Sequence, residues 1–97
     1  MSLHGNPIFE SAHLPDGRNA RIRVGVAQDS YIPESQSSTV VLEVHIGNAV
    51  TAVIDTILDP AQVDAARHLA TRVRDGLASG ELEPTTHSLE RLADEIL

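Results

Sequence analysis

The clearest pattern of apolar and polar residues lies in the first half of the chain, where it predicts antiparallel strands. In residues 20–26 every second residue is apolar, with arginine or glycine between. The same period of two runs through residues 40–46 and, more loosely, through residues 8–14. Because successive side chains of a strand point to opposite faces, each segment can turn one apolar face toward a core.

Turn chemistry predicts a hairpin between the first two strands. The run PDG at residues 15–17 combines a proline that presets φ with a glycine that accepts a positive φ. After the second strand, residues 29–38 are polar and contain a proline. This connection is longer than an ordinary hairpin loop. We expect a surface loop, with Tyr31 and Ile32 as its candidate anchors.

The Gly47-Asn48 pair predicts a second hairpin, whose register depends on the length of its loop. A two-residue loop would turn Thr51 and Asp55 toward the core. A three-residue loop with a bulge keeps the core face apolar, and a slip by one residue would reverse every side chain. We favour the bulged register, which pairs Ile46 with Val50, Val44 with Ala52, and Leu42 with Ile54.

Two amphipathic helices are predicted in the second half, at roughly residues 60–79 and 86–97. Apolar residues recur there at spacings of three and four. Asp59 is the expected N-cap of the first helix, Pro60 its first residue, and Gln62 can close a capping box. The second helix is too short to be stable alone, so its apolar stripe must pack on this chain or on a partner.

The order ββββαα predicts an α+β fold in a single domain, residues 1–97. The expected architecture has two layers: a four-stranded antiparallel meander at roughly residues 8–58, and one long and one short C-terminal helix on one face.

The charge of the chain narrows the classes of partner. The formal net charge is −7, with five acids and three arginines in residues 1–48 and nine acids and four arginines in residues 49–97. An acidic surface repels phosphate backbones and anionic lipids, which disfavours nucleic-acid and membrane binding. Arg18, Arg21 and Arg23 form a small cationic cluster, which leaves nucleic-acid binding as the weakest of the alternatives.

The cysteine content and the hydropathy of the chain indicate its cellular compartment and the kinds of cofactor site it can form. The chain has no cysteine, so disulfides, thiolate metal sites and cysteine catalysis are excluded. No apolar run is long enough to span a bilayer and no signal peptide is visible, so we expect a cytoplasmic protein. All seven basic residues are arginine, which is typical of a high-GC bacterial source. No histidine spacing predicts a metal site, and we expect no cofactor.

The face of the predicted sheet that points away from the core carries the candidate ligand-binding residues. These residues are His45, Glu43, Asp55, Arg21 and Arg23. The two arginines could clamp an anion or, more simply, pair with the two acids across the sheet. Three interpretations of this face stay open, namely a solvent-exposed surface, a protein interface and a ligand site.

Apolar residues on the same face and on the last helix are the interface candidates. They are Val41, Val53, Ile57, Leu92 and Ile96. No catalytic motif is found, so no catalytic residue is assigned, although His45 and Asp55 could form a proton-transfer pair. The leading hypothesis is therefore a small non-enzymatic module that associates with itself as a homodimer, or with another protein. The alternative is a small-molecule or anion-binding domain, or an enzyme, that uses the face around His45.

Overall fold

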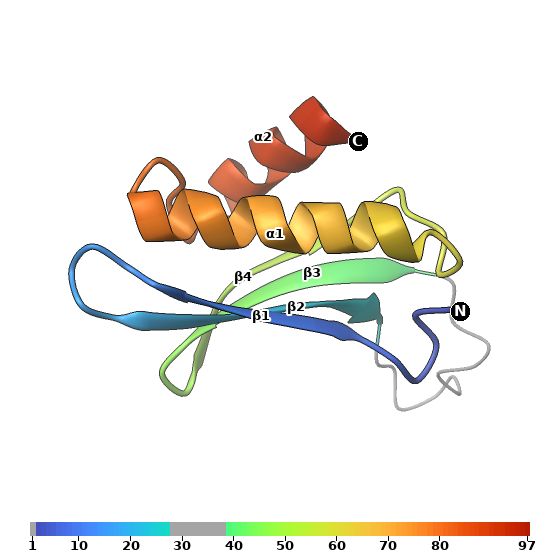
Figure 1. Ribbon diagram of the computed structural model, residues 1–97, viewed down its shortest axis with the longest axis horizontal. Coiled ribbons are helices and arrows are strands. Elements are labelled where there is room, and N and C mark those ends of the chain that lie inside the picture. Colours follow the sequence, from blue (N-terminus) through green and yellow to red (C-terminus); the bar gives the residue numbers. More distant parts are fainter. Residues whose placement is uncertain (1, 28–38) are drawn as a thin grey trace.

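The computed structural model describes residues 2–27 and 39–97, so the expected loop at 29–38, with Tyr31 and Ile32, lies outside the described residues. Four strands form one antiparallel sheet in the order β1-β2-β3-β4. Two helices follow and cover one face of this sheet (Figure 1). The predicted ββββαα meander of two layers is confirmed. The elements are β1 (Ile8–His13), β2 (Asn19–Val26), β3 (Val40–Ile46), β4 (Ala49–Asp55), α1 (Val63–Ser79) and α2 (Thr86–Ile96).

The first hairpin forms where its turn residues predict it. The N–H of Gly17 donates to the carbonyl of Leu14 at 3.0 Å, and Gly17 has a φ of 94°. Asp16 supports the turn, because its carboxylate accepts from both the backbone N–H and the Nε of Arg18. Ala12 of β1 then lies opposite Ala20 of β2, and Ile8 lies opposite Val24, which places these apolar residues on the core-facing side.

The second hairpin corrects one part of the predicted register. Val44 pairs with Ala52 as expected, but Ile46 pairs with Ala49 rather than with Val50. The loop is therefore the two-residue Gly47-Asn48 turn, with a φ of 61° at Gly47. The bulge follows the turn instead of forming part of it, because a glycine with positive φ at the first loop position already closes a tight hairpin.

Thr51 is the extra residue of this bulge. His45 lies opposite Val50 and Val44 lies opposite Ala52, so nothing on β3 pairs with Thr51. Its Oγ1 instead donates to the carbonyl of Val44 at 3.2 Å. The extra residue restores the alternation that keeps Ala52 facing the core.

Helix α1 begins later than predicted. The capping-box bond forms, since the backbone N–H of Asp59 donates to Oε1 of Gln62 at 2.7 Å. Regular helix nevertheless starts only at Val63. The carbonyl of Pro60 accepts from the N–H of Leu3 at 2.8 Å. Residues 59–62 instead form a turn, closed by the bond from the N–H of Gln62 to the carbonyl of Asp59, and this turn receives the N-terminal segment.

The core lies between the sheet and the two helices. It is aliphatic: Ile22, Leu42, Leu69 and Leu77 are fully buried within it. Leu3, to which the sequence assigned no role, is also fully buried. Helix α1 covers mainly β1 and β2, whereas α2 contacts mainly β4. The described residues contain no buried polar or charged side chain, so burial of apolar surface is the main source of stability.

Candidate interaction surface on the outer face of the sheet

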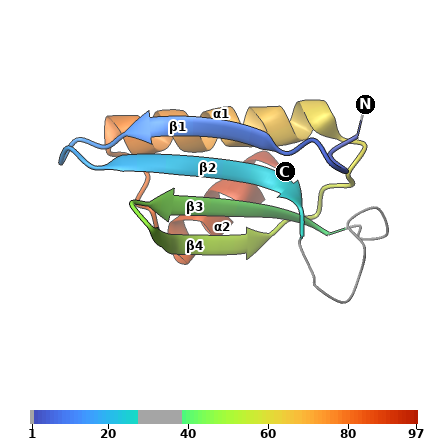
Figure 2. The same cartoon turned by 90° about the horizontal axis from the view of Figure 1, so that it is seen from below.

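The face of the sheet opposite the helices, called the outer face below, carries all five predicted ligand-binding residues. Figure 2 views the molecule from this side, with the four strands in front and both helices behind them. No described helix or strand lies over it. The side chains on this face therefore determine what the protein can present to a ligand or partner.

Three polar side chains form a chain of contacts across the middle of the outer face. Arg23 of β2 lies opposite Glu43 of β3, and its Nη1 donates to Oε2 of Glu43 at 3.1 Å. Nε2 of His45 lies 3.5 Å from the other carboxylate oxygen of Glu43. The side chain of Arg23 is only 12% exposed, that of Glu43 25% and that of His45 26%. The Glu43 carboxylate thus lies close to both basic neighbours. The expected pairing of Arg23 with an acid of the sheet is present.

Asp55 and Arg21 stay apart from this polar chain. Asp55 lies opposite Val41, whereas His45 lies opposite Val50. The pair formed by Glu43 and Val53 lies between these two positions, so it separates His45 from Asp55 along the hairpin. The structure therefore forms no contact between His45 and Asp55. Arg21 lies opposite His45, is exposed, and forms no ion pair with an acid within the described ranges. The polar groups on this face do not converge on a catalytic pair.

Large apolar side chains lie along both sides of the outer face. Phe9 of β1 is 65% exposed, and Val50 and Val53 of β4 are 53% and 46% exposed. Ile57, directly after β4, is 81% exposed. These four are the exposed large hydrophobic side chains of the described residues. Val41, by contrast, is buried and offers little surface to a partner.

The two interface candidates on α2 pack against the chain's own core. Leu92 and Ile96 are partly buried and contact the hydrophobic cluster. Thr85 begins this helix, because its side chain accepts from the N–H of Ser88 at 3.3 Å. The apolar stripe of α2 therefore packs largely against the chain's own core.

A small hollow on the outer face lies between β1, β2 and β3. It has a volume of about 180 Å³ and is lined by Phe9, Arg21, Ile22, Arg23 and His45. Two arginines and an imidazole supply its polar groups, and Phe9 and Ile22 complete the lining. The hollow is large enough for a small anion or a side chain, and the residues that line it belong to the predicted face.

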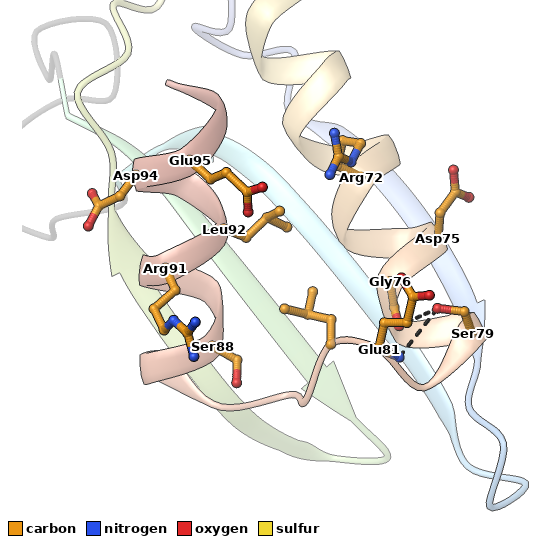
Figure 3. A pocket seen from close by; sticks show the side chains of 11 residues that line it. Arg72, Asp75, Gly76, Ser79, Glu81, Ser88, Arg91, Leu92, Asp94 and Glu95 are labelled. Carbon is orange, nitrogen blue, oxygen red and sulfur yellow. Dashed lines mark hydrogen bonds between the residues drawn. The ribbon is translucent and has the colours of Figure 1, made fainter.

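A larger groove, which the sequence analysis missed, separates α1 from α2. It measures about 900 Å³ and is open to solvent. Figure 3 shows Leu92 and Glu95 pointing toward α1, with Arg72 across the gap. At one end the Ser79 hydroxyl donates to the carbonyl of Gly76 and accepts from the N–H of Glu81. Its charged lining residues are four acids and two arginines. No local sequence pattern could have predicted the separation of the helices.

Local hydrogen bonds shift the pKa of one acid and one base elsewhere in the fold. The backbone hydrogen bond from Arg18 lowers the pKa of Asp16 in the first hairpin turn. Hydrogen bonds from its guanidinium to Asp75 and then to Glu10 raise the pKa of Arg74. Within residues 2–27 and 39–97, no group of three or more histidines and acids is arranged to hold a metal ion.

Comparison with known proteins gives no match to a family model, to a curated protein or to a solved structure. In the described part of the chain, neither helix has the length and hydropathy needed to cross a bilayer.

Proposed function

We propose that the protein is a non-enzymatic association module that forms a homodimer through the β4 side of its outer face. One observation carries the proposal: among the described residues, three of the four exposed large hydrophobic side chains, Val50, Val53 and Ile57, lie on β4 or directly after it. Apolar side chains grouped on an otherwise polar surface are typical of protein interfaces. A cytoplasmic location and a bacterial source remain expectations from the sequence.

The polar centre of the face supports this proposal. Arg23 and Glu43 are hydrogen-bonded to each other, and His45 lies 3.5 Å from the same carboxylate, so Glu43 needs no external ligand to pair its charge. A paired polar centre flanked by apolar side chains can be covered by another protein without stranding a charge.

Sedimentation equilibrium at tens of micromolar tests the proposal. We expect the wild type to be a dimer and Val53→Lys to be a monomer, because a buried lysine at the contact would lack a partner. Ala78→Lys is the matched control, since it adds the same charge at an exposed position of α1. A monomeric wild type, or equal effects of the two substitutions, would contradict the proposal.

The hollow beside Arg21 favours a second candidate function, the binding of a small anion. Arg21 forms no ion pair with a described acid, and the imidazole of His45 lines the same hollow. A guanidinium beside an imidazole can bind a carboxylate or phosphate. Thermal-shift titrations with acetate, benzoate and phosphate test this function. Stabilisation of the wild type that is lost in both Arg21→Ala and His45→Ala supports it, whereas equal responses of the three proteins exclude it.

A further inference from the structure

The two edge strands of the sheet differ in how they are protected from pairing with another chain. At the β1 edge, Glu10 lies opposite Ile22 on the helix-facing side, and its carboxylate accepts from Arg74 of α1 at 2.9 Å. A charge placed inward on an edge strand is a common defence against pairing. At the other edge, β4 carries six uncharged residues in succession, Ala49 to Ile54, with neither proline nor lysine. β4 therefore lacks the inward-pointing charge of β1, and its bulge disrupts the edge only near the hairpin turn.

The backbone of β4 has bonding groups that point outward. The N–H of Thr56 donates to the carbonyl of Val40 at 2.9 Å, so this group points toward β3. Because backbone direction alternates along an antiparallel strand, the N–H and C=O of Val53 and Asp55 point away from β3. No turn, loop or cap hydrogen bond in the described part of the chain uses these groups.

The bulge and the end of the strand define the centre of the free edge. The bulge places Val50 and Thr51 opposite one residue of β3, and it bends the strand at that point. Regular strand then runs from Ala52 to Asp55, where β4 ends. Val53 lies inside this regular segment and has outward-pointing backbone groups.

Resting on the proposed function, we infer that a second copy of the chain pairs antiparallel with β4 about a two-fold axis at Val53. In this register the two Val53 residues exchange both backbone hydrogen bonds, and the two four-stranded sheets become continuous. The half-exposed Val53 side chains meet on the outer face.

The charges of β4 favour a second copy in this register. With the axis at Val53, Asp55 lies opposite the uncharged Thr51 of the second copy, so no like charges face each other. With the axis at Asp55, two carboxylates would lie directly opposite each other, which is destabilising. An axis at Ile54 would also use the outward-pointing groups, but it would place each Asp55 opposite an exposed Val53 of the other copy, so the charge of the strand favours the axis at Val53.

Cysteine scanning tests the inference cleanly, because the chain has no cysteine of its own. In Val53→Cys the paired Cα atoms would be about 5.5 Å apart, within the range that a disulfide bridges. In Asp55→Cys, the matched control, the two cysteines would be displaced by four residues, or about 13 Å along the strands. We expect mild oxidation to cross-link Val53→Cys into a covalent dimer and to leave Asp55→Cys uncross-linked.

The outcomes separate this inference from the proposed function. A dimeric wild type with cross-linking of Asp55→Cys but not of Val53→Cys overturns the register and leaves the homodimer standing. A monomeric wild type overturns both. If reduced Val53→Cys is itself monomeric, amide hydrogen exchange in the wild-type dimer tests the edge pairing instead. Slow exchange at Val53 and Asp55 that becomes fast on dilution supports edge pairing. Exchange that is fast at all concentrations overturns it.

Discussion

Nη1 of Arg23 lies 3.1 Å from Oε2 of Glu43 on the neighbouring strand, and only 12% of the Arg23 side chain is exposed. Gly25 permits this arrangement, because a Cβ there would lie 3.1 Å from Cζ of Arg23 and 2.8 Å from Cβ of Pro7. The guanidinium can therefore lie close to the backbone of its own strand. The pair fixes the polar centre of the outer face.

Removal of this guanidinium should destabilise the fold. We expect Arg23→Ala to lower the free energy of unfolding by about 1–3 kcal/mol, because it leaves the partly buried carboxylate of Glu43 without its donor. Urea denaturation followed by circular dichroism measures the change. Arg21→Ala is the control and should change stability by less than about 0.5 kcal/mol, since that side chain is exposed. Equal losses in the two variants would contradict this account.

Deletion of single residues tests the bulge in β4. Deleting Thr51 removes the residue that has no partner on β3 and leaves Ala52 and Ile54 facing the core. We expect a folded protein that is less stable by about 1 kcal/mol, through loss of the hydrogen bond to Val44.

Deleting Val53 instead should abolish folding, because every later residue of β4 would turn to the opposite face and Ile54 would leave the core. Heteronuclear NMR spectra of the two deletion variants distinguish them. A dispersed spectrum for the Val53 deletion, or a collapsed one for the Thr51 deletion, would show that the bulge lies elsewhere.

Gly76 should be required for the connection between the helices. A Cβ at Gly76 would lie 2.8 Å from Cβ of Leu82, whose N–H also donates to the carbonyl of Gly76. Gly76→Ala should therefore lower Tm, although alanine is favoured over glycine within a helix by about 1 kcal/mol. The control is the double variant with Leu82→Gly, which removes the Cβ that the new methyl group would meet. If the two substitutions prove additive in thermal unfolding, the close approach is not the cause.

Leu3 should contribute to stability as a core residue, although it lies near the start of the chain. It is fully buried, and its backbone donates to Pro60. We expect Leu3→Ala to cost about 2–5 kcal/mol in unfolding free energy. Leu3→Met keeps most of the volume and should cost less than about 1.5 kcal/mol. A small effect of the alanine variant in urea denaturation would mean that the N-terminal segment does not pack on the core.

Much of the candidate site could be predicted from the sequence because strand alternation assigns side chains to faces. The period of two places Arg21, Arg23, Glu43 and His45 on one side of the sheet, whatever the details of the loops. Their pairing could not be predicted, because the partner of Arg23 depends on the order of the strands and on the register between β2 and β3, and no short turn fixes that register. The position of Asp55 depends on the bulge at Thr51, and either loop length satisfies the local turn chemistry.

The sequence by itself determined the order of the elements, both turn positions and the separation of apolar from polar faces, since these depend on residues close together in the chain. Only the tertiary structure decided where the bulge lies, where α1 begins, that Leu3 is buried and that a groove separates the helices. Each of these results from contacts between distant segments, such as the bond from Leu3 to the carbonyl of Pro60. Local patterns do not contain such contacts, because their geometry is set by how the layers pack.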